Sequence, residues 1–401
     1  MDAPGRVGVV GAGTMGAGIA QVALEAGHEV ALYDVAPGAV ELARTRIADG
    51  LGRRAAKLGL DDGGAEDWVA ARMVRLRRVN TLDAVADDAF LVIEAAVEDL
   101  ALKRVVFATL DARAAAETIL ATNTSALPVA SIAADATRRS RIVGLHFFNP
   151  APVMSLVEVV VGPDTDARTA KRAEALVRRW GKTPIRCSDS PGFVVNRINR
   201  PFTLEPLRIL ELGAATIEEI DAAVRAEGFP QGPFEHIDLI GLDVNLSTST
   251  AVYAGLGSPP RLAPSQLQAR LVAARRLGRK TGVGFYEYDA SGHRVRPGPG
   301  FGRRGGKHVP LEAAALARRV RLALANEAYF ALGDGVAAAD RIDLALRLGA
   351  AHPQGPLEWA AAQGLASVRD ELLALERAEG GCFTPAPALE AAADQVRVDA
   401  P

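Results

Sequence analysis

The sequence predicts a Rossmann-type, doubly wound α/β domain at the N-terminus, followed by all-α domains that contain a duplicated helical unit. In the first half of the chain, short apolar runs of strand length alternate with longer helical patterns, as in a parallel sheet covered by helices on both faces. After Pro191-Gly192 the alternation stops and helical patterns follow. The pattern of residues 205–235 then returns in residues 327–358, which indicates an internal repeat.

Length and composition restrict the class of protein. A chain of 401 residues is long enough for two or three domains. Its 46 Lys and Arg nearly balance its 48 Asp and Glu, so no overall field favours nucleic acid or an anionic membrane as a partner. Cys187 and Cys382 have no metal-ligand spacing, so we expect free thiols and no metal site. We find no leader and no apolar run of about 20 residues, which predicts a soluble, cytoplasmic protein.

The first expected strand, residues 7–10, ends in the glycine-rich turn Gly11-Ala12-Gly13-Thr14-Met15-Gly16, and a helical pattern follows at once. A second strand, residues 29–33, then leads to Asp34. This is the complete context of a dinucleotide-binding turn, with the pyrophosphate at the helix N-terminus and the acid on the adenosine ribose. No Arg or Lys follows Asp34 directly, so NAD is expected rather than NADP. The alternative is a glycine turn in an unrelated α/β fold.

Polar residues at or after the later strands extend this expected site. Glu98 and Lys103 follow the apolar run 90–93, while Asn123 and Ser125 follow the run 119–121. Ligands of open α/β sheets bind at these carboxyl ends of strands. Ser125 could equally cap the helix expected after Pro128, and the sequence alone favours that cap.

A basic segment ends the helix expected over residues 37–58, where Arg53, Arg54 and Lys57 lie close together. Most such runs are solvated helix faces. Beside a dinucleotide site, the same residues could bind the phosphates of a second anionic ligand.

The stretch from His146 to Glu158 carries the candidate chemistry. His146 ends an apolar strand, residues 141–145, and Glu158 interrupts a second apolar run, residues 156–161. A carboxylate in such surroundings needs a partner, and an imidazole oriented by a buried carboxylate can act as a general base. The alternative is a core histidine and a glutamate that points outward from an edge strand.

These residues occur in motifs that resemble the NAD-dependent L-3-hydroxyacyl-CoA dehydrogenases, including the 3-hydroxybutyryl-CoA dehydrogenases. The resemblance covers about residues 5 to 288. Its motifs are Gly11-Ala12-Gly13-Thr14-Met15-Gly16, Thr122-Asn123-Thr124-Ser125, His146-Phe147-Phe148-Asn149-Pro150, Leu156-Val157-Glu158-Val159, Ser190-Pro191-Gly192-Phe193-Val194-Val195-Asn196-Arg197, Phe229-Pro230-Gln231-Gly232-Pro233-Phe234 and Lys280-Thr281-Gly282-Val283-Gly284-Phe285-Tyr286.

The resemblance implies oxidation of L-3-hydroxyacyl-CoA thioesters to 3-oxoacyl-CoA, and the reverse, in fatty-acid or related acyl-CoA metabolism. It makes His146 the catalytic base, Glu158 its carboxylate partner, and Ser125 and Asn196 the contacts to the substrate oxygen. The implied NAD contacts are Gly11, Gly13, Thr14, Met15, Gly16, Asp34, Glu98, Lys103, Asn123, Ser125, Asn149 and Lys280.

The coenzyme A contacts depart from the family pattern. Where the family usually has a serine and a lysine on the basic helix, this chain has Asp49 and Ala56. Arg53, Arg54 and Lys57 are then the candidates for the phosphates. This departure leaves open a dehydrogenase of the same architecture that acts on a free small hydroxy acid or sugar acid. A non-catalytic NAD-binding structural protein is the third possibility. Chain length, including dicarboxylic thioesters, also stays open.

The second half is expected to hold two copies of a 6-phosphogluconate-dehydrogenase-like helical domain. Helical patterns cover residues 196–213, 216–228 and 234–253, and Thr216 with Glu219 three residues later fits a capping box. We expect an NAD-binding domain over residues 1–187, a helical domain over 188–290, a linker over 291–308 and a degenerate second copy over 309–401. Arg318 stands in the second copy where the first has Asn196, so that copy is expected to be structural. In single-copy members of the family the helical domain forms the dimer interface. The chain is therefore expected to be a monomer with an internal pseudo-dimer, or a homodimer.

Overall fold

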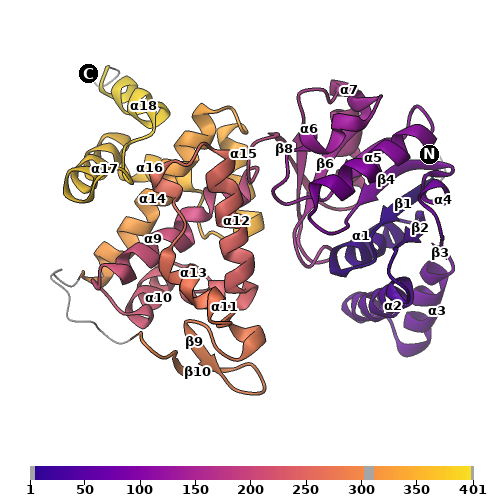
Figure 1. Ribbon diagram of the computed structural model, residues 1–401, viewed down its shortest axis with the longest axis horizontal. Coiled ribbons are helices and arrows are strands. Elements are labelled where there is room, and N and C mark those ends of the chain that lie inside the picture. The colour runs from indigo at the N-terminus through magenta and orange to yellow at the C-terminus, as the bar shows by residue number, and fades with distance from the viewer. Residues whose placement is uncertain (1–4, 302–310, 399–401) are drawn as a thin grey trace. The chain divides into compact units, whose positions relative to one another are not determined.

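The computed structural model describes residues 5–301 and 311–398. They form two compact units, Met1–Phe193 and Val194–Pro401 (Figure 1). The first unit is an α/β domain with a central sheet, and the second is largely helical. The predicted fold class is therefore confirmed.

The sheet of the first unit has eight strands in the order β3-β2-β1-β4-β5-β6-β7-β8. Neighbours pair in parallel except β6 and β7, which are antiparallel. The first six strands have the order of a Rossmann fold, in which ligands bind beyond the carboxyl ends of the strands. The strands are β1 (Arg6–Val10), β2 (Glu29–Tyr33), β3 (Leu76–Arg78), β4 (Ala89–Glu94), β5 (Ile119–Thr122), β6 (Ile142–Phe147), β7 (Leu156–Val161) and β8 (Thr183–Ser188).

Helices cover both faces of this sheet. The helices are α1 (Thr14–Glu25), α2 (Ala39–Lys57), α3 (Asp62–Met73), α4 (Leu82–Ala86), α5 (Leu100–Arg113), α6 (Val129–Ile132) and α7 (Ala167–Arg179). Val7 and Val9 of β1 share one apolar core with α1, α2 and α7. Gly8, between them, faces the other side, where an added Cβ would meet the Val85 carbonyl of α4 at 2.5 Å. Strands buried on both faces explain why their sequences are continuously apolar.

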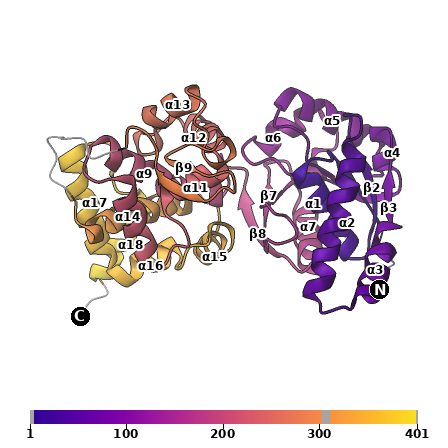
Figure 2. The same cartoon turned by 90° about the horizontal axis from the view of Figure 1, so that it is seen from below.

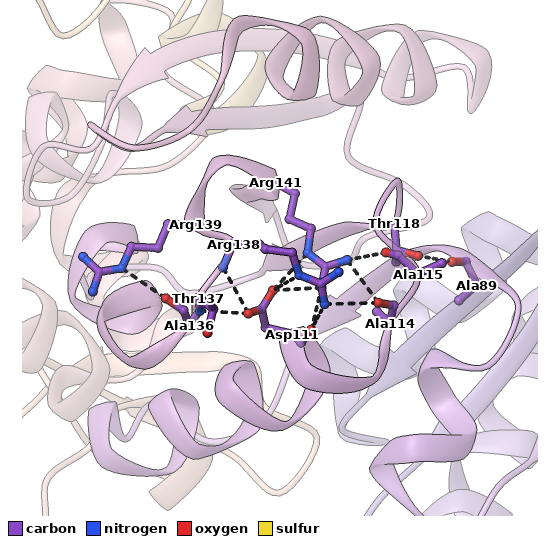
Figure 3. A network of polar contacts seen from close by, with 10 residues as sticks. All are labelled: Ala89, Asp111, Ala114, Ala115, Thr118, Ala136, Thr137, Arg138, Arg139 and Arg141. Atoms are coloured by element: carbon purple, nitrogen blue, oxygen red, sulfur yellow. Dashed lines mark hydrogen bonds and ion pairs between the residues drawn. The ribbon is translucent and has the colours of Figure 1, made fainter.

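A buried ion pair fixes the start of β6, the strand that ends near His146. Arg141 donates from Nε to Asp111 Oδ1 at 3.1 Å and from Nη2 to the same oxygen at 2.8 Å. The other carboxylate oxygen accepts from the N–H groups of Thr137 and Arg138 (Figure 3). Burial tends to raise the pKa of Asp111, but Arg141 and these N–H groups together lower it. The loop before β6 is thereby tied to α5.

The described residues of the second unit form helices and a hairpin. The elements are α8 (Val195–Ile198), α9 (Arg200–Glu211), α10 (Ile217–Ala226), α11 (Pro233–Ile240), α12 (Leu242–Gly255), α13 (Gln266–Ala273), β9 (Tyr286–Tyr288), β10 (Arg294–Pro297), α14 (Ala313–Gly333), α15 (Ala339–Ala350), α16 (Pro356–Gln363), α17 (Leu365–Glu379) and α18 (Pro387–Val398). Three features differ from the sequence-based expectation.

The helix expected between Phe234 and Tyr253 is interrupted at Gly241, whose φ of 100° ends α11 and separates it from α12. The helix expected from Asn196 to Gly213 is divided into α8 and α9 at Asn199, which keeps right-handed angles (φ −81°, ψ 0°) and directly precedes the Arg200-Pro201 start of α9. The hairpin β9–β10 was not expected, and β10 falls within the segment 291–308 predicted as a linker. Residues 302–308 of that segment lie outside the described residues. The capping box at Thr216 is confirmed, because its hydroxyl accepts from the Glu219 N–H at 3.2 Å.

The two helical repeats pack on each other with an internal two-fold pattern. Helices α9 and α14 lie side by side (Figures 1 and 2). Arg197 donates to Glu327 at 2.8 Å, and Arg319 donates to Glu205. Arg197 and Arg319 occupy equivalent repeat positions, as do Glu205 and Glu327, so each repeat supplies the same arginine to the glutamate of the other. This reciprocity is the pattern of an isologous interface, here within one chain.

Candidate active site

His146 and Glu158 form a buried pair at the carboxyl end of the sheet. They are direct partners in the antiparallel register of β6 and β7, which brings their side chains together on one face. His146 Nδ1 lies 2.6 Å from Glu158 Oε2, and the two side chains are 6% and 0% exposed. An ionised Glu158 that accepts from Nδ1–H leaves the lone pair on Nε2 available for another proton. The expected contact between the two residues is therefore present.

The loop after His146 is held in place by three separate contacts. Asn123 Oδ1 accepts from the Phe147 N–H at 2.8 Å, which joins the ends of β5 and β6. Lys182 Nζ donates to the carbonyls of Ala151 at 2.6 Å and Met154 at 2.7 Å. The Asn149–Pro150 peptide bond is cis. Lys182 was missed by the sequence analysis, because its role depends on the return of β8 beside β7 and not on a local motif.

The aromatic ring of Phe148 packs on the imidazole of His146 at a centroid distance of 4.6 Å, and that of Phe193 at 5.7 Å. These rings keep one side of the imidazole away from water. An ion pair in such surroundings is stronger than in solvent.

A second polar cluster lies where β4 and β5 end. Glu94 is fully buried and accepts from Lys103 Nζ at 2.6 Å and from the Thr122 hydroxyl at 2.7 Å. Lys103 also lies 3.3 Å from Glu98. Glu94 was not among the predicted site residues, although an acid that ends a continuously apolar strand is a sequence signal for such a cluster. The Lys103 side chain is only 1% exposed to solvent, and its ion pair with Glu94 is the shorter of the two.

Glu98 organises the turn that contains Ser125. Its Oε1 accepts from the Thr124 hydroxyl at 2.5 Å and from the Ser125 N–H at 3.0 Å. Burial tends to raise the pKa of Glu98, but Lys103 and these donors outweigh it, so the pKa is lowered. A carboxylate that stays ionised holds the backbone of the turn, while the Ser125 residue is exposed.

The prediction that Ser125 caps the next helix is wrong. The N–H groups of Val129 and Ala130 at the start of α6 donate to the two carboxylate oxygens of Asp189, each at 2.8 Å. Asp189 is 60 residues away in the chain, so no local pattern could indicate it. With α6 capped by Asp189, Ser125 is not required as its cap.

The glycine turn after β1 fits a dinucleotide. Gly11 has φ of 100°, and a Cβ there would meet the Ala95 carbonyl at 2.5 Å. A Cβ on Gly16 would meet the Gly11 carbonyl at 1.9 Å, whereas a Cβ on Gly13 would meet nothing within 4 Å. Gly13 is the N-cap of α1, and no side chain among the described residues caps that helix. The space at Gly13 and the uncapped N–H groups suit a pyrophosphate.

Asp34 lies beside this turn, at the end of β2. Its Oδ2 accepts from the Ala12 N–H at 2.7 Å and its Oδ1 from the Ala36 N–H at 2.8 Å. Each carboxylate oxygen keeps a further lone pair, so the expected contact with ribose hydroxyls is compatible with these bonds.

A basic pocket of about 550 Å³ opens between α1, α2 and the loop after β6. Arg46, Arg53, Arg54 and Lys57 line it, opposed by one acid, Glu25. The remaining lining residues are Thr14, Ala17, Gly18, Gln21, Ile47, Gly50, Pro150, Pro152 and Val153. The three residues predicted to bind coenzyme A therefore share one pocket. Arg46 was missed, because it stands two helical turns before them.

Asn196 and Lys280 belong to the second unit. Asn196 lies in α8, and Lys280 Nζ forms an ion pair with Asp243 at 2.6 Å. Their expected contacts with substrate and NAD stay predictions. Among residues 5–301 and 311–398, three or more His, Cys, Asp or Glu side chains nowhere gather as a possible metal site. In that same part of the chain, the helices are too short or too polar to cross a membrane.

Comparison with known proteins follows the same division of the chain. The model of the 3-hydroxyacyl-CoA dehydrogenase NAD-binding domain matches residues 6–190, and that of the C-terminal domain matches residues 192–288 and 316–399. The chain is 36% identical to 3-hydroxyadipyl-CoA dehydrogenase of Escherichia coli, over 89% of this chain and 90% of that one. It is 41% identical to a probable 3-hydroxybutyryl-CoA dehydrogenase of Bacillus subtilis, over 71% of this chain and 97% of that one.

The crystal structure of 3-hydroxybutyryl-CoA dehydrogenase from E. coli is similar along nearly the whole length. It has a TM-score of 0.88 and 32% identity, with 98% of this chain and 99% of that chain covered. The similarity thus includes both helical repeats.

Proposed function

The chain belongs to the 3-hydroxyacyl-CoA dehydrogenase family, and from this premise we propose that it oxidises L-3-hydroxyacyl-CoA to 3-oxoacyl-CoA with NAD, and catalyses the reverse. The main observation in support of this proposal is the buried pair of His146 and Glu158. A structural NAD-binding protein has no need of an imidazole held by a carboxylate at the end of its sheet.

His146 moves the proton in this reaction. Neutral His146 accepts the proton of the C3 hydroxyl on Nε2, while Nδ1–H stays bonded to Glu158 at 2.6 Å. NAD supplies the acceptor for the hydride that leaves C3. Glu158 stabilises the imidazolium that results, and in the reverse direction His146 returns the proton to the oxygen. The aromatic rings around His146 limit access of water to this proton.

Ser125 and Asn196 are proposed to orient the C3 oxygen and to stabilise the charge that develops on it. For Ser125, the proposal is supported by the hydrogen bond that fixes its backbone to Glu98 and by the exposure of the residue. For Asn196, it is supported by the motif in which the residue stands.

We propose that the basic pocket binds the phosphates of coenzyme A. Four cations and one carboxylate line it, which gives an excess of positive charge suited to a phosphate-rich ligand. Arg46 joins Arg53, Arg54 and Lys57 as a phosphate ligand. A free hydroxy acid offers no such group, so the pocket favours the thioester over the alternative of a free acid.

We further propose that the second helical repeat takes the place that a partner's helical domain has in single-copy relatives. The reciprocal pairs Arg197–Glu327 and Arg319–Glu205 support an internal pseudo-dimer. Light scattering at micromolar concentration should give the mass of a monomer. A tight dimer that uses the α9 face would contradict the proposal.

The reaction is tested by NADH oxidation with acetoacetyl-CoA, in parallel with NADPH. We expect turnover with NADH, little with NADPH, and a loss of about 10³-fold in kcat for His146→Gln. His293→Gln is the matched control, because that histidine is 79% exposed and lies outside the site. A folded, NADH-binding protein that reduces no thioester would refute the assignment, and free hydroxy acids would be tested next.

A further inference from the structure

Arg200 is a buried arginine without a carboxylate. It is the first residue of α9 and only 5% exposed. Its Nε donates to the Asn196 carbonyl at 2.7 Å, and its Nη1 donates to the Ser249 hydroxyl at 3.3 Å. Among the described residues, no Asp or Glu forms an ion pair with it. Both partners are neutral, so the charge of the guanidinium is uncompensated.

Other buried arginines of the molecule are compensated. Arg141 pairs with Asp111, Arg197 with Glu327, and Arg319 with Glu205. An uncompensated buried charge costs several kcal/mol, so Arg200 is an exception that needs a cause. Burial lowers the pKa of Arg200 to about 10, and the residue therefore remains a cation at neutral pH.

The groups around Arg200 add no negative charge. Burial, followed by repulsion from Arg200, lowers the pKa of His236 to about 4, so this histidine is neutral at pH 7. Asn245 lies one turn before Ser249 on α12, and its buried Nδ2 has no hydrogen-bond partner in the part of the chain that the structure describes. The N-terminal end of α9 also carries positive partial charge. The cation of Arg200, the unused donor of Asn245 and the N-terminus of α9 are all suited to bind an anion.

The anion can be related to the substrate through Asn196. Asn196 and Arg200 stand four residues apart, and the bond from Arg200 Nε to the Asn196 carbonyl ties them together. Asn199, between α8 and α9, keeps right-handed helical angles (φ −81°, ψ 0°), so the four residues from Asn196 to Arg200 rise about 6 Å. A short dicarboxylic chain spans a comparable distance between its hydroxyl-bearing carbon and its far carboxylate.

We propose that Arg200 binds the terminal carboxylate of the acyl chain, which makes the preferred substrate a short dicarboxylic 3-hydroxyacyl thioester. The inference rests on the proposed function, and in particular on Asn196 as a contact to the C3 oxygen. A planar guanidinium suits a carboxylate because two parallel N–H donors match its two oxygens. An acyl chain that ends in a methyl group would leave the Arg200 cation without a counter-charge. The site should therefore select dicarboxylic over neutral acyl chains.

The test compares 3-oxoadipyl-CoA with 3-oxohexanoyl-CoA, which have the same chain length and differ in the terminal carboxylate. We expect the wild-type protein to prefer the dicarboxylic substrate by at least about 10-fold in kcat/KM. Arg200→Met should lose roughly 10- to 100-fold on the dicarboxylic substrate and little on the neutral one. Arg200→Lys should keep part of the preference. Arg270→Met, on the exposed side of α13, is the matched control.

A wild-type protein that shows no preference overturns the proposal whatever the variants do, including the case in which Arg200→Met fails to fold. Equal losses on both substrates also overturn it, because they indicate a structural role. Binding of the two thioesters to the NAD-bound protein by calorimetry separates the two levels of inference. Without turnover, tighter dicarboxylic binding that depends on Arg200 refutes the reaction but supports the anion site. Equal binding refutes the anion site.

Discussion

Replacing Glu158 by Gln tests the chemistry of the site with little change in its shape. The amide oxygen can still accept from His146 Nδ1–H, so the imidazole keeps its orientation. What is lost is the negative charge that faces the imidazolium formed during the reaction. Two unit charges about 4 Å apart attract by about 4 kcal/mol at an effective dielectric constant near 20. That value suits a pair whose side chains are 6% and 0% exposed, and it corresponds to about a 10³-fold loss of kcat.

The assay is the NADH-dependent reduction of acetoacetyl-CoA, with kcat and KM determined separately and the melting temperature recorded for each variant. Glu117→Gln is the matched control, since Glu117 is 67% exposed and pairs with surface arginines. We expect KM and the melting temperature of Glu158→Gln to change little. A loss of kcat below about 10-fold, in a folded variant, would refute the idea that Glu158 acts by its charge on His146.

Three further outcomes are expected. Burial, then Arg321 and His236, lowers the pKa of His352 from 6.5 to about 3, so the unfolded chain binds a proton below pH 6.5 that the native state does not. The free energy of unfolding should therefore fall as the pH drops from 6.5, by about 2 kcal/mol at pH 5 from this group, and urea titrations of His352→Phe should show a weaker fall. Glu327→Ala removes the buried carboxylate that pairs with both Arg197 and Arg261, while Arg197 keeps its ion pair with the 57%-exposed Asp334. The substitution should cost about 3 kcal/mol in the same measurement, and a change below about 1 kcal/mol would contradict this. Arg53→Gln combined with Lys57→Gln should raise KM for the CoA thioester about 10-fold without affecting a thioester that lacks the CoA phosphates, and equal effects on both thioesters would argue against the basic pocket.

Features set by local sequence were predictable. The strand, glycine turn, helix and acid from residue 7 to Asp34 follow from residue types and spacing, because each step is fixed by nearby atoms. The same holds for the capping box at Thr216, where donor and acceptor are three residues apart. The contact of His146 with Glu158 was predictable because two apolar strands in succession, each with one polar residue, place these two side chains in register.

Features set by distant contacts were not predictable. Asp189 caps α6 from 60 residues away, which is why Ser125 was wrongly favoured as that cap. The NAD contact of Lys103 stays a prediction, but its ion pair with the buried Glu94 could not be foreseen, because the pair forms only when β4 and α5 pack. Arg200 looked like one arginine among many, because the lack of a carboxylate is a property of the folded unit.

The two-fold pattern between α9 and α14 has a consequence for how the protein can evolve. In a dimer of identical chains, every substitution enters the interface twice. Here the pair Arg197–Glu327 and the pair Arg319–Glu205 are encoded by separate codons. A substitution in one pair therefore leaves the other pair unchanged. Dilution cannot separate the two repeats, since they share one chain. Each repeat can therefore differ from the other in sequence, and the second has Arg318 at the position where the first has Asn196.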